Sequence, residues 1–492
     1  MKKINLNLNE NIKFVKKTLG NNRDIKERMI NFKYIKDKIC VFYSESLCDT
    51  KKIDDFVINP ILESLKKNII IKSSKIIQIL SDLVLYQSTK SNSFEDVFYN
   101  LFSGNAIIFV ENSDVVLIVE AKDILTRQIT EAKTDITTKG PKEAFVEDIG
   151  KNIGLVRKRL KDENLWSETI IVGRRTKTRV DLLYIKDIID LKFVNKAMES
   201  IKNIDIDGIF DGEYIIELIK KESKTFFPTM LRTERPDITA MSLLDGKLVL
   251  LVDNSPFAVI APSFFTDFVQ AAEENYRNPV TSSMVRTIRF LGLFIFLLLP
   301  GYYISVMTHN HEAIPPDLLI NFVVQREGVP FPALVEVLIM TFAFDLLNEA
   351  DARLPSSMGS AISIVGALIL GEASIEAGIA SPITIIIVAM TSVASLALPS
   401  SEFTNALKIW QLFFMLSAAT FGSLGLLVVL IIFVLRLTNI RTFGVPYLRG
   451  FAPFNMDDQK DAVIRLSRRK IHKRPSLINQ KNPTRQRIVD EP

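Results

Sequence analysis

The stretch Ile288-Arg-Phe-Leu-Gly-Leu-Phe-Ile-Phe-Leu-Leu-Leu-Pro-Gly-Tyr-Tyr-Ile-Ser-Val-Met307 divides the 492-residue chain into two parts of different character. As a helix this stretch spans about 30 Å, which is the thickness of the hydrocarbon core of a bilayer. Arg286 and Arg289 lie at its start, and positive charge favours the cytoplasmic side of a membrane. The sequence therefore predicts an integral membrane protein whose N-terminal region, which lacks the apolar segment of a signal peptide, stays in the cytoplasm.

Four further apolar segments follow, at residues 331–350, 360–380, 383–398 and 409–435. The last is long enough to cross a bilayer as one tilted helix. Arg436, Arg441 and Arg449 come after it, which places the C-terminus in the cytoplasm as well. Because both termini then lie on one side, the number of crossings is even. We expect four crossings, with one segment within 331–380 re-entrant or only partly inserted.

Charged residues interrupt two of these segments. Asp345, Glu349 and Arg353 recur every four residues and share one helical face, with Glu349 and Arg353 in the favourable order for an ion pair. Charges at membrane depth usually face a bundle interior or a water-filled path. They are therefore candidates for an ion path or a gate, the alternative being an interfacial segment whose charges reach water. The full candidate set is Glu336, Asp345, Glu349, Arg353, Glu372 and Glu376.

The N-terminal region contains an internal repeat. Residues 11–19 resemble residues 152–160, at an offset of 141, and residues 104–113 resemble residues 246–255, at an offset of 142. In each copy a basic helix precedes an apolar strand, at 39–43 or 180–185, and a helix near 51–66 or 191–201. A hairpin ends the copy, 105–110 with 115–120 or 247–252 with 257–261, around turns rich in Asn and Asp. Coincidental strand patterning is the alternative explanation.

The fold class expected is a tandem-duplicated α/β soluble region followed by an α-helical transmembrane bundle. The domains expected are residues 1–139 and 140–280 as cytoplasmic α/β subdomains, 281–450 as the transmembrane domain, and 451–492 as a disordered basic cytoplasmic tail.

Composition limits the partners and the chemistry. A net charge of +5 is too small to indicate nucleic-acid binding, and much of the excess lies at residues 465–474. Such a basic run fits an anionic lipid surface or a solvated tail. The Cys and His residues form no metal-binding pattern, and no catalytic constellation or cofactor motif is present. We therefore expect no enzyme activity, no metal and no cofactor.

Several stretches resemble the signature of the GerA family of spore germination proteins. They are residues 127–131 and 139–147, Asn152–Leu160, Val172–Thr178, Thr233–Asp237, Val329–Pro332, Glu349–Pro355 and Ser363–Gly371. The stretches occur in order over nearly the whole chain.

The resemblance implies an A-type subunit of a germinant receptor in the inner membrane of the spore. It implies a transporter-like B-type subunit and a lipoprotein C-type subunit as partners, self-association as a homo-oligomer, and ion release when nutrients bind. The alternatives are a non-conducting scaffold that clusters other subunits and a paralogue that serves dipicolinate release. A secondary transporter is disfavoured because no inverted repeat is evident.

The soluble motifs supply candidates for coupling or subunit contact. Residues Gly140 and Pro141 are typical of a linker, here between the two subdomains, and residues 143–147, which end at Glu147, are expected to start the next helix. The basic segment with Arg174 and Arg175 fits an anion site or, in the favoured interpretation, a surface for a partner or lipid. In the remaining motif, Pro236 and Asp237 suit a helix start, and Glu234 and Arg235 suit an ion pair at a subunit contact.

Overall fold

The computed structural model describes residues 2–20, 22–30, 38–59, 88–122, 131–132, 134–135, 137–219, 225–353, 356–475 and 482–486. The chain separates into two compact units. The first contains residues 1–224, 230–262 and 468–492, and the second contains residues 225–229 and 263–467.

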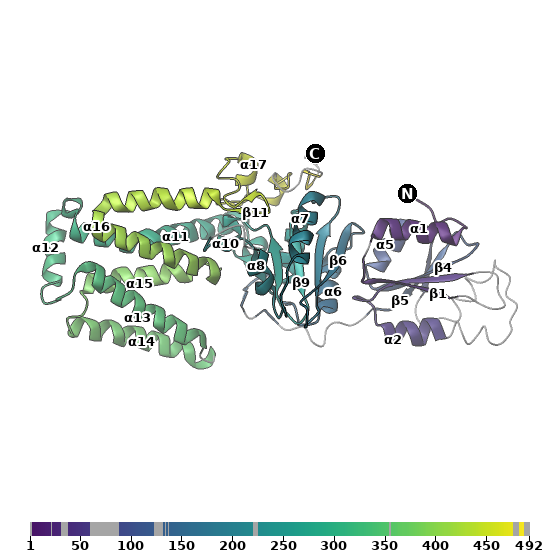
Figure 1. Cartoon of the computed structure of the whole chain (residues 1–492), viewed down its shortest axis with the longest axis horizontal. Helices are drawn as coiled ribbons and strands as arrows, with labels where there is room; N and C mark the ends of the chain where they lie inside the picture. Colours follow the sequence, from purple (N-terminus) through teal and green to yellow (C-terminus); the bar gives the residue numbers. More distant parts are fainter. Residues whose placement is uncertain are drawn as a thin grey trace. The chain divides into compact units, whose positions relative to one another are not determined.

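The first unit begins with an antiparallel five-stranded sheet of order β1-β2-β4-β5-β3. Its strands are β1 (Ile25–Ile30), β2 (Ile39–Ser44), β3 (Ser88–Ser91), β4 (Asn105–Val110) and β5 (Val116–Glu120). Helices α1 (Leu8–Leu19) and α5 (Phe94–Leu101) pack on the face that carries Phe42 and Phe109. Helix α2 (Thr50–Ile53) and a π-helical turn (Asp54–Ile58) cover the face that carries Val41 and Ile108 (Figure 1). Central strands buried on both faces explain the continuous apolar runs in the sequence.

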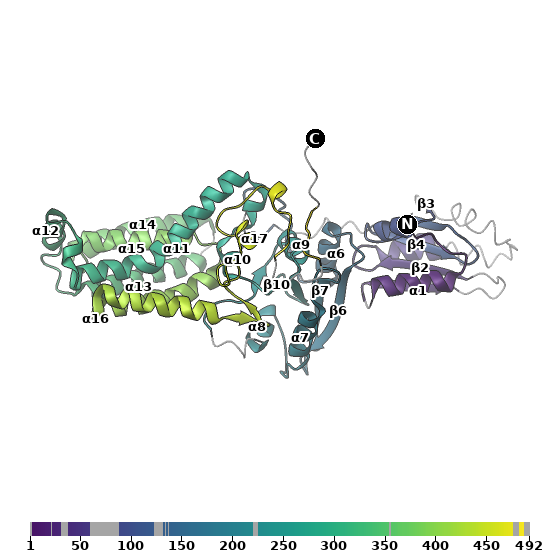
Figure 2. The ribbon, with the colours of Figure 1, turned by 90° about the horizontal axis from the view of Figure 1, so that it is seen from above.

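A second sheet repeats this arrangement strand for strand, in the order β6-β7-β9-β10-β8. Its strands are β6 (Leu165–Val172), β7 (Thr178–Ile185), β8 (Leu231–Thr233), β9 (Leu248–Val252) and β10 (Ala258–Ala261). Helices α6 (Ile149–Arg159) and α9 (Pro236–Leu244) cover one face, and α7 (Leu191–Lys202) and α8 (Gly212–Ile219) lie on the other (Figure 2). Both predicted hairpins are confirmed, and their turns place Asn112 and Asn254 at positive φ.

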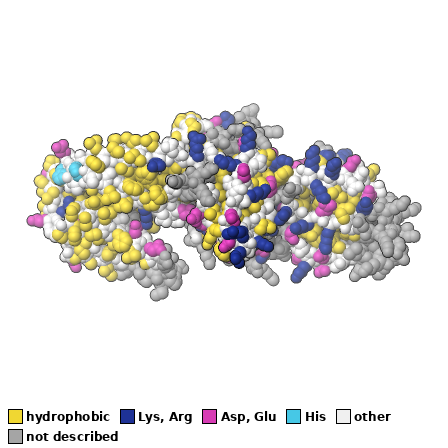
Figure 3. All heavy atoms as spheres, in the orientation of Figure 1, with side chains coloured by type: hydrophobic (Ala, Val, Ile, Leu, Met, Phe, Trp, Pro, Cys, Tyr) yellow, Lys and Arg dark blue, Asp and Glu magenta, His cyan; other side chains and the backbone are white. Residues whose placement is uncertain are grey.

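The second unit is mainly helical. It contains α10 (Phe265–Val269), a 3-10 turn (Ala272–Tyr276), α11 (Pro279–Thr308), a 3-10 turn (His311–Ala313), α12 (Pro316–Gln325), α13 (Ala333–Arg353), α14 (Ser356–Glu376), α15 (Pro382–Leu396) and α16 (Ser401–Asn439). By length and composition, α11 and the stretch Ser401–Asn439 taken as one helix could each cross a membrane. Figure 3 shows hydrophobic side chains gathered over this helical part, with few charged groups among them.

Helix α16 is interrupted at Gly422, so the prediction of a single long helix over residues 409–435 is wrong. Gly422 has φ +63° and ψ −142°, values that are not helical and that essentially only glycine adopts. The ring of Phe433 lies 5.2 Å from that of Trp410 and 6.2 Å from that of Phe414, so the segments before and after Gly422 run back along each other. The described part of the unit therefore holds six apolar helical segments rather than five. Six segments would also allow an even number of crossings, so the expectation of four crossings with one re-entrant segment stays a prediction.

The segment after α16 is also ordered. It forms a small antiparallel pair, β11 (Arg441–Thr442) with β12 (Val445–Pro446), and a short helix α17 (Met456–Gln459). Tyr447 is buried among the rings of Phe227, Phe265 and Phe268. The prediction of a disordered tail from residue 451 is wrong for residues 451–467, which pack within the second unit.

Candidate functional site

Glu336 is a fully buried carboxylate in the helical unit. Its Oε1 atom accepts hydrogen bonds from Arg326 Nε (3.1 Å) and Nη2 (2.8 Å). Its Oε2 atom accepts from the backbone N–H of Ser381 (3.1 Å) and the hydroxyl of Thr384 (2.9 Å). Ser381 is the N-cap of α15, so the carboxylate also lies at the positive end of a helix dipole. Among the predicted acidic residues, Glu336 therefore belongs to the interior of the bundle.

Asp345 lies instead on a half-exposed face of α13. Its carboxylate accepts a hydrogen bond from Lys408 Nζ on α16 at 2.8 Å, and the two side chains are 39% and 34% exposed. Each residue lies about 11 Å inside its helix, counted from the end of α13 and from the start of α16. A charge pair at this depth would be costly if it faced lipid. The structure thus gives Asp345 a partner, Lys408, that the sequence analysis did not single out.

The other predicted charges of this region are spread out rather than clustered. Glu349, one turn after Asp345, is exposed, and so are Glu372 and Glu376 near the end of α14. The side chain of Arg353 lies outside the described residues, so its proposed pairing with Glu349 stays a prediction. In the described residues, no group of three or more His, Cys, Asp or Glu side chains is arranged to hold a metal ion.

Arg235 organises the soluble motif at residues 233–237. Its side chain is 1% exposed and donates to Thr137 Oγ1 (2.7 Å), to the carbonyl of Pro141 (2.7 Å) and to Asp237 Oδ2 (2.9 Å). Asp135 is bound beside it, because its Oδ2 atom accepts from the Thr233 hydroxyl at 2.7 Å. Burial raises the pKa of the Asp135 carboxyl. The motif therefore holds the segment before α6 against the second sheet.

This geometry corrects the predicted role of Arg235. We expected Glu234 and Arg235 to form an ion pair at a subunit contact, but Arg235 is buried within its own unit and its carboxylate partner is Asp237. The Glu234 side chain is buried as well, and it accepts from the backbone N–H of Thr134 at 3.4 Å. Pro236 occupies the first turn of α9, as predicted.

The remaining soluble candidates lie at the surface. Gly140, at φ +108°, is exposed. The prediction that residues 143–147 start a helix is wrong, because α6 begins at Ile149 and the exposed Glu147 precedes it. Arg174 and Arg175 are exposed in the loop between β6 and β7, where Arg174 pairs with Asp205 (3.3 Å) and Asp207 (3.1 Å). These two acids reduce the positive charge that an anion would meet. Residues 127–130 of the family signature lie outside the described residues.

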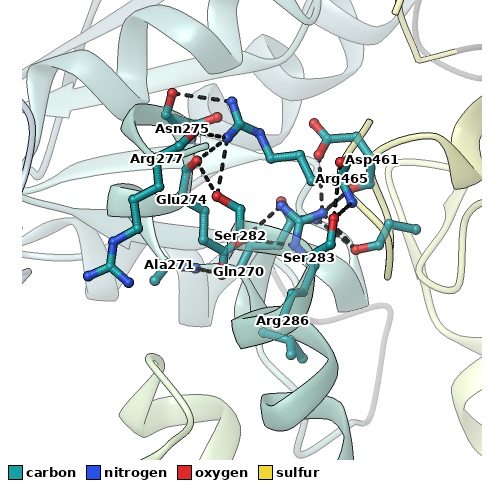
Figure 4. A network of polar contacts seen from close by, with 12 residues as sticks. Gln270, Ala271, Glu274, Asn275, Arg277, Ser282, Ser283, Arg286, Asp461 and Arg465 are labelled. Atoms are coloured by element: carbon teal, nitrogen blue, oxygen red, sulfur yellow. Dashed lines mark hydrogen bonds and ion pairs between the residues drawn. The ribbon is translucent and has the colours of Figure 1, made fainter. Parts of the chain in front are cut away.

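A buried charge network surrounds the start of α11 (Figure 4). The Glu274 carboxylate, 2% exposed, accepts from Arg286 Nε at 2.8 Å and forms a second ion pair with Arg289. Arg286 also donates to Asp461 Oδ1 at 3.1 Å. Arg465 is 6% exposed and donates to the carbonyl of Arg277 at 2.9 Å.

This network revises one sequence interpretation. Arg465 was expected to belong to a solvated or lipid-binding basic run, whereas Arg286 and Arg289 served only to place the start of the apolar helix in the cytoplasm. All three are buried in protein, where they join the chain after α17 to the first turns of α11.

Comparison with known proteins agrees with this architecture. The model of the family described as Bacillus/Clostridium GerA spore germination protein matches residues 13–477. The chain belongs to the GerA family. Among its GerA relatives, spore germination protein KA of Bacillus subtilis (strain 168) is 37% identical over 98% of this chain and 89% of the relative. Spore germination protein GerLA of Bacillus cereus is 32% identical over 97% of each chain.

One solved GerA structure is also similar, the crystal structure of the N-terminal domain of the A subunit of the Bacillus megaterium spore germinant receptor GerK3. It is 32% identical, with a TM-score of 0.43, and the match covers 54% of this chain and 98% of that chain.

Four residues of these sites were not predicted from the sequence: Arg326, Lys408, Glu274 and Asp461. Each forms an ion pair with a residue at least ten positions away, so helical spacing carries no signal for it. A usable signal did exist for Lys408, since it is a cation within an otherwise apolar helix.

Proposed function

We propose that this chain is the A-type subunit of a spore germinant receptor and converts nutrient binding into ion release across the inner spore membrane. Family membership and the names of the relatives support the first part. The second part rests on the helical unit. We propose that several copies form a conduit there, with Asp345 and Glu349 along the ion path.

The observation that carries the proposal is a charged pair in an apolar helical surface. Large hydrophobic side chains are exposed along the helices, among them Phe342 and Leu346 on α13 and Val428 and Leu435 on α16. Such a surface suits lipid or a neighbouring subunit. Asp345 and Lys408 are half-exposed within it. A water-filled path between copies would give this pair a polar environment, as membrane charges require.

The proposal includes a location and partners. The two α/β sheets and both termini would lie in the spore core, and the helices would cross the inner membrane. A transporter-like B-type subunit and a C-type lipoprotein would complete the receptor, and exposed basic groups after residue 467 would contact anionic lipid.

Potassium release from spores tests the ion-path claim. We expect the Asp345→Asn variant to release potassium more slowly than wild type after addition of germinant, and Asp345→Glu to retain most of the rate. Asp114→Asn, the same change at an exposed carboxylate in the hairpin turn between β4 and β5, is the matched control. Immunoblotting must show equal protein levels in all spores.

The outcomes separate the alternatives. Normal potassium release by Asp345→Asn would refute the role of that residue. Release that is unaffected by all the membrane charges would favour a scaffold. A defect in dipicolinate release with normal potassium release would favour a paralogue of the dipicolinate machinery.

A further inference from the structure

A chain of buried oxygen atoms extends from Glu336 across three helices. Thr384 Oγ1 donates to Glu336 Oε2 and also lies 2.9 Å from Ser381 Oγ and 3.0 Å from Tyr303 Oη. Glu336, Ser381 and Thr384 are 0% exposed, and Tyr303 is 5% exposed. The side chains come from α11, α13 and the start of α15, so their positions are fixed by helices rather than by a loop.

The surroundings of these oxygen atoms are apolar. Val337, Met340, Ala380 and Val388 belong to the same buried core as Tyr303. An ionised carboxylate in such a place requires a positive partner, because its desolvation costs several kcal/mol. In the described residues, the cation bound to Glu336 is Arg326.

Arg326 reaches the Glu336 carboxylate from outside the helices that carry the buried oxygen atoms. It follows the end of α12, its side chain is 20% exposed, and its Nη2 atom also donates to the carbonyl of Phe331 at 3.3 Å. The oxygen atoms belong to packed helices, whereas the cation belongs to a turn. A displacement of the turn would therefore remove the positive charge and leave the carboxylate behind.

We propose that Glu336, whose Oε2 atom is held by the hydroxyl chain of Thr384, Ser381 and Tyr303, is the centre of a monovalent-cation site, and that the Arg326 guanidinium holds the place of the ion beside Oε1 in this conformation. When the turn moves away, Na⁺ or K⁺ takes the place of the guanidinium. Carboxylate and hydroxyl oxygens are the ligands that hard cations prefer. The hydroxyl hydrogens can rotate, so each oxygen can present a lone pair to the ion.

The charge balance selects the class of ion. One carboxylate neutralises one positive charge, so a divalent ion would leave an uncompensated charge in an apolar core. The site differs from the ion path proposed at Asp345, and its existence does not require the chain to conduct ions.

Thermal unfolding of the purified full chain in detergent tests the site. The Arg326→Ala variant is compared in NaCl, in KCl and in N-methylglucamine chloride at equal ionic strength. We expect NaCl or KCl, at concentrations well above the dissociation constant, to raise the midpoint of this variant by about 5 °C in a saturable way. Wild type should show no such difference, because its own guanidinium occupies the site.

Two further variants make the test specific. The Arg326→Ala/Glu336→Gln double variant lacks the carboxylate and should not respond, and Arg326→Lys should not respond because its ammonium group replaces the ion. An equal response in the double variant would overturn the proposal. So would an Arg326→Ala variant that remains unfolded in every salt, or one that is stabilised by acidification but by neither alkali-metal ion.

Discussion

Arg157→Ala should separate the two α/β halves of the first unit more than any other single substitution in it. Arg157 on α6 donates from Nε to Asp24 Oδ2 at 2.5 Å and from Nη2 to Asp24 Oδ1 at 3.0 Å. The two side chains are 0% and 3% exposed. The guanidinium also lies 4.9 Å from the ring centre of Phe102. The bond thus joins the second half of the unit to the first through a fully buried pair.

The magnitude follows from this burial. Removing one member of a buried ion pair leaves the other charge without compensation and costs about 3–5 kcal/mol of unfolding free energy. Replacing both members with apolar side chains, as in Arg157→Met/Asp24→Leu, should cost much less, because no charge remains buried. Lys158→Ala, which removes an exposed cation from the same helix, should cost less than about 1 kcal/mol.

Trp166 provides the assay. Its Nε1 atom donates to the carbonyl of Thr18 at 3.3 Å, so its fluorescence reports on the contact between the halves. Trp410 is the other tryptophan of the chain, and a Trp410→Phe background leaves Trp166 as the single reporter. Urea unfolding of Arg157→Met, Asp24→Leu and the Arg157→Met/Asp24→Leu double variant forms a double-mutant cycle. A coupling energy below about 0.5 kcal/mol would refute the reasoning, since that is the scatter expected of independent sites.

Three other substitutions test separate features. Tyr447→Phe should raise the stability of the helical unit by up to about 1 kcal/mol, because the buried Tyr447 hydroxyl has no hydrogen-bond partner among the residues that the structure describes. Tyr303→Phe should lower the stability, because it removes a hydrogen bond with Thr384, and thermal unfolding distinguishes the two variants. Gly422→Ala should lower the melting midpoint, since its Cβ would lie 2.8 Å from Asn310 Oδ1 and its backbone would be strained by about 1–3 kcal/mol. Gly444→Ala, which also has a positive φ but open space around its Cβ, is the control. An equal loss in both variants would show that the contact with Asn310 contributes nothing. Asp135→Asn should reduce the pH dependence of unfolding of the first unit. Burial raises the folded-state pKa of Asp135, so its ionisation lowers the stability of the unit as pH rises from about 4 through that folded pKa. An unchanged pH profile of unfolding, followed by Trp166 fluorescence, would contradict this.

The sequence predicted the centre of each sheet but not its edges. Strands β2, β4, β7 and β9 are buried on both faces, so they appear as apolar runs. The edge strands β1, β3, β6 and β8 were not predicted. Residues 25–30 and 88–91 are rich in charged and polar side chains, as is common for strands paired on one side only, and β8 has three residues.

In the helical unit, composition identified the apolar segments but not their breaks. Gly422 lies within a continuous apolar run, and only its backbone angles and contacts separate two helices from one. Glu336 lies nine residues before Asp345, a spacing that puts the two on about opposite faces of a helix, and their buried and half-exposed positions agree with it. Their partners Arg326 and Lys408 depend on tertiary packing, which one sequence does not reveal.

The most direct measurement is potassium efflux from liposomes that contain this chain together with its B-type and C-type subunits. On addition of the germinant that activates wild-type spores, we expect efflux through wild type. With Asp345→Asn we expect efflux slower by about tenfold, which corresponds to about 1.4 kcal/mol of lost cation stabilisation. Asp345→Glu should remain close to wild type. An absence of germinant-dependent efflux through wild type, or equal efflux through Asp345→Asn, would contradict a cation path along this face of α13.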